Sequence, residues 1–331
     1  MINTEHHANI KQIGNELMSA RHLLLAAHSD PDGDALGSML GLYHLLSSLG
    51  CQIKMFREGQ LPVDYSFLDG AEQVMNELPA AEWPDAVVLL DCHDPGRAGK
   101  ILNDWIQPEH KIIVIDHHIG TVNSSYLICK EPTASATAEL VTMLAEQMRW
   151  PINIMAANAL FAGIVADTGY FSQSNTTGRV LRLAGWLVDN GATPAPIAAA
   201  AKSRALNRLR LHAEILNATR AMLGERLLLL QATRQQLSHY QCGNADLEGL
   251  VEQLMLVRGV MIGVLLKEIT ADTIKVSMRS KPHIDISELA MSFEGGGHKN
   301  AAGFKLAGSL DYVRDRLVQK IVLLLEHTNG R

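Results

Sequence analysis

Short apolar runs alternate with longer helical patterns along the first 190 residues. Residues 35–50 repeat apolar side chains at helical spacing and end at Gly50, which suits a helix C-cap. Further helices are predicted at 135–148, 153–166 and 176–191. Four short runs are nearly continuously apolar, which is typical of parallel strands covered on both faces. They are RHLLLAA (21–27), CQIKMF (51–56), AVVLLD (86–91) and KIIVID (111–116). The alternation predicts βαβ units, and therefore an α/β domain with a mostly parallel sheet.

A segment of small residues and prolines, 191–204, interrupts this pattern and is predicted to be a linker. Beyond it the pattern predicts helices at 204–222, 244–256, 286–293 and the chain end, strands at 226–233, 259–268, 273–280 and 301–308, and a glycine loop at 295–300. We therefore expect an N-terminal α/β domain (1–190), a linker (191–204) and a smaller mixed α+β C-terminal domain (205–331). The active site is expected in the cleft between the two domains.

Composition fits this division. A chain of 331 residues with 47% hydrophobic residues is long enough for two cores. No stretch is long and apolar enough for a membrane span, and the four cysteines are widely spaced, so a cytoplasmic location without a membrane partner is expected. The net charge of −6 argues against a binder of long nucleic acids, which usually carries a basic stripe.

Charge is divided unevenly between the two halves. Residues 1–205 hold 13 Lys and Arg against 22 Asp and Glu, whereas residues 206–331 hold 16 against 13. The acidic half is suited to metal cations and the mildly basic half to an anion, although ordinary surface variation explains this count equally well.

Carboxylates and imidazoles follow the ends of four predicted strands or helices in the first domain. The C-terminal ends of parallel strands open on one crevice, so these side chains are expected to converge. Crowded carboxylates repel one another unless a cation compensates them. A single aspartate after a strand is usually a turn or cap residue, but four such clusters in order favour a metal site. The clusters are His28, Asp32 and Asp34; Asp91; Asp116, His117 and His118; and Asp167.

The donor set is rich in oxygen, contains two or three imidazoles and has no thiolate. It favours manganese or magnesium and leaves zinc, cobalt and iron open. The site offers more ligands than one ion uses, so two ions are predicted, with Asp91 as the carboxylate that bridges them. A water held between two such ions is acidic enough to attack phosphorus at neutral pH.

Five segments, in this order, closely resemble the motifs of the DHH phosphoesterase superfamily: HSDPDGDALGS, LLDCHDPGR, VIDHH, VADTGYF and GGGHKNAAGF. The two-domain length and the GGGH segment resemble the group of bacterial oligoribonucleases (nanoRNases) and phosphatases of 3'-phosphoadenosine 5'-phosphate (pAp). The resemblance implies that His118 faces the substrate phosphate and that Asp116 orients a neighbouring imidazole, so that Asp91, His118 and Asp116 are the catalytic residues. It implies two sets of metal ligands, one of His28, Asp32 and Asp91 and the other of Asp34, Asp91, His117 and Asp167.

In the second domain the resemblance implies substrate-binding residues. Arg279 and Ser280 resemble a pair that holds a second phosphate, and an arginine fork matches phosphate oxygens well. Three glycines let a backbone approach an anion closely, although a glycine loop alone is an equally common surface feature. The resemblance places Gly296, Gly297 and His298 at the substrate.

The implied function is a phosphoesterase that uses two Mn²⁺ ions, with Mg²⁺ or Co²⁺ as alternatives, and cleaves short single-stranded RNA oligonucleotides to mononucleotides and pAp to AMP. A phosphodiesterase of cyclic or linear dinucleotides (pApA, pGpG) and an inactive nucleotide-binding regulator are the alternatives. No long nucleic acid is expected as a partner, and a homodimer is left open.

Overall fold

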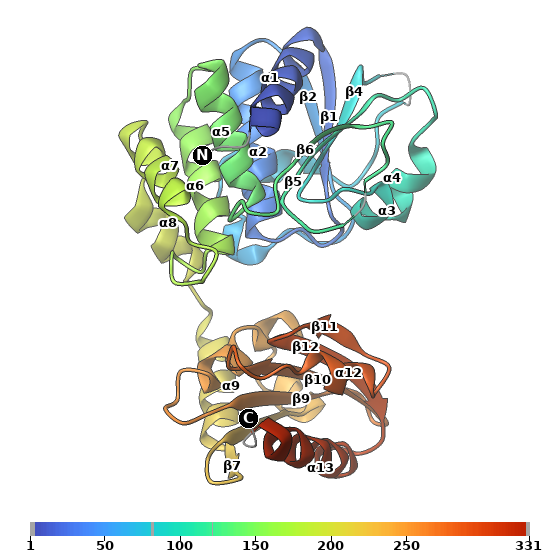
Figure 1. Ribbon diagram of the computed structural model, residues 1–331, viewed down its shortest axis with the longest axis vertical. Coiled ribbons are helices and arrows are strands. Elements are labelled where there is room, and N and C mark those ends of the chain that lie inside the picture. The colour runs from blue at the N-terminus through green and yellow to red at the C-terminus, as the bar shows by residue number, and fades with distance from the viewer. Residues whose placement is uncertain (1–3, 81–82, 121, 329–331) are drawn as a thin grey trace. The chain divides into compact units, whose positions relative to one another are not determined.

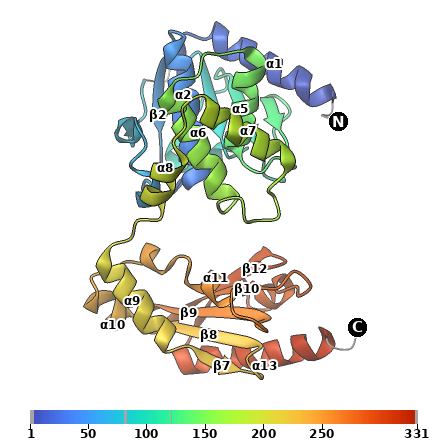
Figure 2. The ribbon, with the colours of Figure 1, turned by 90° about the vertical axis from the view of Figure 1, so that its left-hand side faces the viewer.

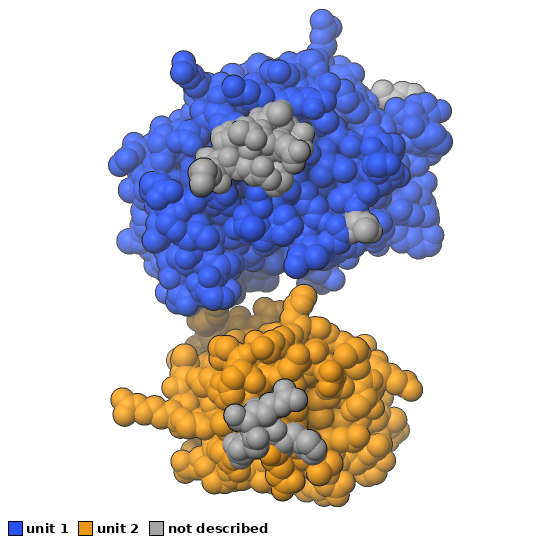
Figure 3. Space-filling model, in the orientation of Figure 1, with its two compact units in different colours: residues 1–203 blue, residues 204–331 orange. Residues whose placement is uncertain are grey.

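The computed structural model describes residues 4–80, 83–120 and 122–328, and it divides into two compact units, 1–203 and 204–331 (Figures 1 and 3). Each contains one six-stranded sheet, called sheet A in unit 1 and sheet B in unit 2. No helix in the described part of the chain is long and apolar enough to cross a membrane.

Sheet A is entirely parallel, with strand order β3-β2-β1-β4-β5-β6. This confirms the predicted parallel sheet. The chain adds β2 and β3 on one side of β1 and the later strands on the other, so the order reverses between β1 and β4. Its strands are β1 (His22–Ala27), β2 (Gln52–Phe56), β3 (Val74–Met75), β4 (Ala86–Leu90), β5 (Ile112–Asp116) and β6 (Leu127–Lys130).

Helices cover both faces of sheet A (Figure 1). Side chains of α1, α2, α5, α6 and α7 form a large core with one face, and those of α3 and α4 form a smaller core with the other. The helices of this unit are α1 (Thr4–Ser19), α2 (Gly33–Ser48), α3 (Pro95–Ala98), α4 (Lys100–Trp105), α5 (Thr137–Met148), α6 (Ile154–Asp167), α7 (Gly178–Asp189) and α8 (Pro194–Ala201), with short 3-10 helices η1 (Val63–Tyr65) and η2 (Ala71–Gln73).

Helices α2 and α6 pack unusually closely because glycines face each other. A Cβ atom added at Gly37 would lie 2.6 Å from the carbonyl oxygen of Ala159 and 2.7 Å from the backbone nitrogen of Gly163. The close approach brings the start of α2, which carries Asp34, next to the end of α6, which carries Asp167.

Sheet B has strand order β11-β12-β10-β9-β8-β7, with β8 and β9 parallel and the other pairs antiparallel. Side chains of α12 and α13 pack on one face, and those of α9, α10 and α11 pack on the other. Figure 2 shows α11 and α13 on opposite sides of the sheet. Unit 2 comprises α9 (Leu206–Asn217), β7 (Arg220–Met222), β8 (Leu227–Ala232), α10 (Arg234–His239), η3 (Ala245–Leu247), α11 (Leu250–Leu254), β9 (Ile262–Thr270), β10 (Thr273–Ser280), α12 (Ser287–Met291), β11 (Gly296–His298), β12 (Ala301–Ala307) and α13 (Leu310–Thr328).

The structure corrects three predicted elements of this unit. The helix predicted at 204–222 ends at Asn217, and its last residues form the edge strand β7, which is too short to show alternation. The helix predicted at 244–256 is split by Gly249, whose φ of +83° lies outside the helical region. The predicted glycine loop at 295–300 contains β11, which the sequence does not reveal because glycine carries no side-chain pattern.

The predicted linker, 191–204, contains helix α8, and Ile197 of this helix packs into the core of unit 1. The predicted division into residues 1–190, 191–204 and 205–331 stays a prediction.

Candidate metal centre and active site

The acidic clusters meet where the strand order of sheet A reverses. His28 follows β1, Asp91 follows the adjacent strand β4, and Asp116 ends β5. A reversal of strand order leaves a crevice at the carboxyl ends of the two diverging strands, and such crevices are the usual ligand sites of open α/β sheets.

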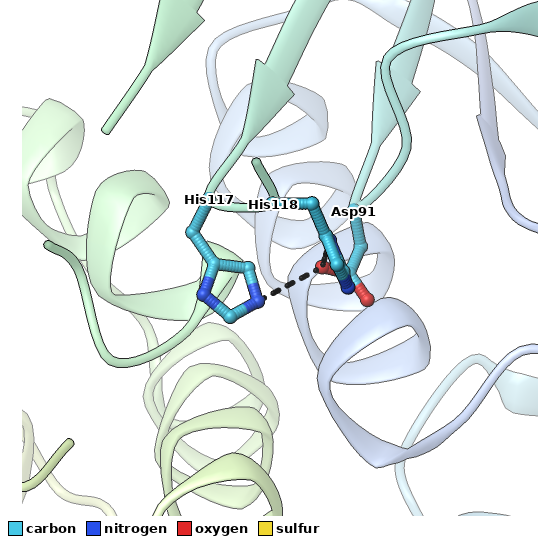
Figure 4. A group of neighbouring side chains, drawn as sticks. All are labelled: Asp91, His117 and His118. Carbon is cyan, nitrogen blue, oxygen red and sulfur yellow. Dashed lines mark ion pairs between the residues drawn. The ribbon is translucent and has the colours of Figure 1, made fainter. Parts of the chain in front are cut away.

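Seven side chains form three overlapping groups in which the candidate ligand atoms lie within 4.8 Å of one another. His28, Asp32 and Asp91 form the first group, Asp34, His117 and Asp167 the second, and Asp91, His117 and His118 the third. Figure 4 shows the third group, with the imidazoles of His117 and His118 turned toward the Asp91 carboxylate.

The Asp91 carboxylate belongs to the first group and also faces His117 of the second. Its Oδ2 atom is 3.5 Å from Nε2 of His28, and its Oδ1 atom is 3.5 Å from Nε2 of His117. The residue is 1% exposed and has a φ of +58°, a left-handed conformation that aspartate tolerates better than most residues. Each oxygen therefore faces a different imidazole, as a carboxylate shared by two cations would.

The hydrogen bonds of the two imidazoles fix which nitrogen is available to a metal. Nδ1 of His28 lies 3.0 Å from the carbonyl oxygen of Ser29, and Nδ1 of His117 lies 3.2 Å from that of Ala134. A carbonyl oxygen only accepts, so Nδ1 carries the hydrogen in both rings. Nε2 of each ring faces the carboxylates and is therefore the nitrogen available to a metal, which is the usual arrangement of a ligating histidine.

His118 is oriented differently. Its Nδ1 atom donates to Oδ1 of Asp116 at 2.9 Å, and the same carboxylate accepts the backbone N–H of His118 at 3.0 Å. The hydrogen bond that His118 donates to Asp116 raises the pKa of His118, although burial opposes the shift. A protonated Nδ1 has no lone pair for a metal, so the first two groups fit cations better than the third does.

Asp116 also holds a second imidazole. Its Oδ2 atom lies 2.8 Å from Nδ1 of His93, and the carboxylate is completely buried. Burial would raise the pKa of Asp116, but the hydrogen bonds from His118 and His93 outweigh it and lower the pKa to about 2. Asp116 is therefore an anion that fixes two rings, and the sequence-based prediction did not include His93.

The N-terminus of helix α5 holds two buried carboxylates of the centre, Asp34 and Asp91. The backbone N–H groups of Thr137 and Ala138 donate to the two oxygens of Asp34 at 2.6 and 2.9 Å. The hydroxyl of Thr137 donates to Oδ1 of Asp91 at 2.9 Å. The free N–H groups and the dipole of a helix N-terminus favour negative charge, so α5 stabilises and orients both side chains. The sequence predicts this helix, but not the contacts of Thr137 with residues 103 and 46 positions earlier.

Two carboxylates of the centre, Asp34 and Asp167, are only partly compensated by the protein. Burial and repulsion from Asp91 and Asp167 raise the pKa of Asp34 well above its usual value. Burial likewise raises the pKa of Asp167 to about 6, with Asp91 adding to the shift and His117 opposing it. Burial would lower the pKa of His28, but its hydrogen bonds with Asp32 and Asp91 raise it to about 10. The metal-free centre therefore retains protons that a divalent cation would replace.

The substrate-binding residues predicted in the second domain lie along two strands of unit 2. Arg279 pairs with Glu252 at 2.8 Å and donates to the carbonyl of Met278. Ser280 is buried, and its hydroxyl donates to the carbonyl of Ile284 and accepts from Asn300. The segment with Gly296, Gly297 and His298 is exposed on β11, which pairs with β12.

Comparison with known protein families matches residues 22–164 to the DHH family, N-terminal domain, and residues 229–326 to the DHHA1 domain. A relative from Thermus thermophilus named bifunctional oligoribonuclease and PAP phosphatase NrnA is 30% identical, over 90% of this chain and 89% of its own length. A relative of the same name from Bacillus subtilis is 28% identical, over 85% and 88%.

Among solved structures, an exopolyphosphatase-related protein from Bacteroides fragilis has a TM-score of 0.87 at 24% identity, and the match covers 97% of this chain and 98% of that chain. At this identity the likeness shows the fold alone.

Proposed function

The chain belongs to the DHH family of phosphoesterases, and we propose that it hydrolyses short RNA oligonucleotides to mononucleotides and pAp to AMP with the help of two Mn²⁺ ions. The names of the two relatives support the substrates. The observation that carries the two-ion proposal is the position of Asp91, whose two oxygens face His28 and His117 separately. A cytoplasmic location and a homodimer stay predictions.

The donor set fits the proposed ions. Carboxylate oxygens with a few imidazoles suit Mn²⁺, and Mg²⁺ or Co²⁺ are alternatives. One ion would be held by His28, Asp32 and Asp91, and the other by Asp34, Asp91, His117 and Asp167. When bound, such a pair neutralises the carboxylates, polarises the phosphoryl oxygens and makes a water acidic enough to attack phosphorus.

The residues of the chain divide the remaining tasks. The N-terminus of α5 keeps Asp34 and Asp91 in place, so little reorganisation is needed when substrate arrives. His118, held by Asp116, is half-exposed and has a raised pKa, so it is suited to donate a hydrogen bond to a phosphoryl oxygen. We assign Arg279, Ser280 and the segment Gly296–Gly297–His298 to the second phosphate or the sugar of the substrate.

Purified protein with Mn²⁺, incubated in parallel with pAp, pGpG, an RNA pentamer, cyclic di-AMP and pyrophosphate, tests the substrate proposal. We expect release of AMP from pAp and of mononucleotides from the pentamer. Preferential hydrolysis of cyclic di-AMP or of pGpG would instead support a dinucleotide phosphodiesterase, and hydrolysis of none of the substrates would support a binding protein.

Two sets of variants test the proposed site residues. We expect Asp91→Asn to abolish hydrolysis of every substrate, because both ions lose their shared ligand. We expect His298→Ala and Arg279→Ala to slow the hydrolysis of the pentamer and of pAp far more than that of bis-p-nitrophenyl phosphate, a minimal diester without a second phosphate. Near-normal turnover by Asp91→Asn would contradict the shared ligand, and equal losses on all substrates would contradict the roles assigned to His298 and Arg279.

A further inference from the structure

Part of one face of sheet B is polar and accessible. Ile274, Val276 and Met278 of β10 and Ala302 and Phe304 of β12 point into the core with α13. Because side chains alternate along a strand, the residues between them point to the other face. On β10, β12 and β11 these residues are Lys275, Ser277, Arg279, Ala301, Gly303, Lys305, Gly296 and His298, none of which is buried.

Three lysines lie in register across this face. Lys275 is paired with Lys267 of β9 on one side and with Lys305 of β12 on the other. Lys275 and Lys305 are exposed, and Lys267 is half-buried. Among the described residues, the side chains of the three lysines make no hydrogen bond and no ion pair.

Such a row is unfavourable for the isolated protein. Like charges directly opposite each other on neighbouring strands destabilise a sheet. Burial, followed by the charges of Lys275 and Lys305, lowers the pKa of Lys267, and Glu248 opposes this only in part. Three adjacent ammonium groups that form no ion pair with described residues are complementary to a ligand that carries several negative charges.

A second row of polar residues on the same face contains Arg279 and His298, which we assign to the substrate. Arg279 is paired with Ala301, and Ala301 with His298. Arg279 and Lys275 are four positions apart on β10, which corresponds to about 13 Å along a strand.

On β10, β12 and β11, only small residues lie between the two rows. Ser277 is paired with Gly303, and Gly303 with Gly296. No atom lies within 4 Å of the position that a Cβ would take at Gly296, so packing does not demand glycine there. Small residues therefore separate the lysine row from the row of Arg279 and His298, and they leave space for a chain of nucleotides. The guanidinium of Arg279 also pairs with Glu252.

We propose that Lys267, Lys275 and Lys305 form a distal phosphate-binding row that engages the backbone of RNA oligonucleotides longer than a dinucleotide. The continuity of this row with Arg279 and His298 favours RNA over an acidic peptide. The inference rests on the proposed function. It adds a contact that pAp and dinucleotides are too short to make, and a single row suits oligonucleotides rather than long RNA.

The test compares the variants Lys275→Gln, Lys305→Gln and the double variant with Lys320→Gln, an exposed lysine on α13 against the opposite face of the sheet. The kcat/KM values for pAp, an RNA dinucleotide and an RNA heptamer are measured with Mn²⁺ at about 50 and about 200 mM KCl. The double variant is expected to lose roughly tenfold on the heptamer at low salt and less than about twofold on pAp. The slope of log kcat/KM against log salt should become shallower by about 1.4, since each phosphate contact on a single strand contributes about 0.7.

Binding of a fluorescein-labelled heptamer to the metal-free protein, followed by anisotropy, separates this inference from the proposed function. If no substrate is cleaved, the proposed function fails, but weaker binding by the double variant than by Lys320→Gln still supports the row. Equal binding by these two variants would overturn the row, as would equal losses on pAp and the heptamer. Displacement of the labelled heptamer by polyglutamate as readily as by unlabelled RNA of the same charge would also overturn it. Unfolding temperatures should not fall, because the variants remove like charges from paired positions.

Discussion

The hydroxyl of Thr137 provides the sharpest test of how the centre is held together. It donates to Oδ1 of Asp91 at 2.9 Å, and both residues are almost completely buried. Thr137→Val replaces the hydroxyl by a methyl group of similar size, which leaves this oxygen without its donor. The backbone N–H of residue 137, which donates to Asp34, is unchanged by the substitution.

A hydrogen bond to a charged group contributes about 1.5–3 kcal/mol, and the metal-free protein has no cation to replace it. We therefore expect the free energy of unfolding of metal-free Thr137→Val to fall by about 1.5–3 kcal/mol. We also expect kcat with Mn²⁺ to fall about ten- to hundredfold, because small displacements of a catalytic carboxylate are costly. Thr137→Ser keeps the donor and loses only a methyl group, so it should retain most of kcat and lose about 1 kcal/mol of stability.

Urea unfolding of the chelator-treated protein, followed by tryptophan fluorescence, measures this difference for unit 1 alone. All four tryptophans belong to this unit: Trp83, Trp105, Trp150 and Trp186. Turnover of bis-p-nitrophenyl phosphate gives kcat without a contribution from the second phosphate. A valine variant that matches wild type in both measurements, or a serine variant as impaired as the valine variant, would refute the positioning role.

Three further predictions concern the charge and packing around the centre. His28 has a pKa of about 10 in the metal-free protein, and a protonated ring cannot bind a metal, so Mn²⁺ affinity should rise with pH from about 6 to 10. Calorimetry in buffers of different ionisation enthalpy should detect the release of protons on binding. An affinity that does not depend on pH would contradict this prediction. Below pH 6 protonation of Asp167 should weaken binding further. Arg179→Met should lower the unfolding free energy by about 3–5 kcal/mol, because it leaves the buried carboxylate of Glu139 without its ion-pair partner at 2.5 Å. The double variant with Glu139→Gln should recover part of this loss in the same urea experiment. Gly37→Ala should lower the free energy of unfolding by about 1–3 kcal/mol and reduce Mn²⁺ affinity, because the new methyl group pushes α2 away from the backbone of α6. An unchanged affinity would mean that this packing does not position the ligands.

The continuous apolar runs predict the strands of sheet A well, since strands buried on both faces require such runs. The predicted strands at 21–27, 51–56, 86–91 and 111–116 correspond to β1, β2, β4 and β5. The short edge strands β3, β6 and β7 escape prediction, because two to four residues give no periodicity and their pairing partners supply most of the stabilisation.

For the centre, the sequence supplies the identity and order of the acidic and imidazole residues, and the rule that parallel strands open on one crevice predicts that they meet. The contacts of Thr137 with Asp91 and of His93 with Asp116 join separate elements, and no local pattern encodes them. The direction of each oxygen of Asp91 likewise depends on a left-handed backbone at the end of β4.

Local patterns and side-chain chemistry are enough to predict the α/β class, the strands β1, β2, β4 and β5, and the residues available to bind cations. Three features become visible only in the folded chain: the nitrogen of His28 and of His117 that is available to a metal, the carboxylates that α5 stabilises, and the single row of Lys267, Lys275 and Lys305. The physical reason is that pairing register and helix packing bring together groups far apart in the chain, and a list of residues carries no record of those distances.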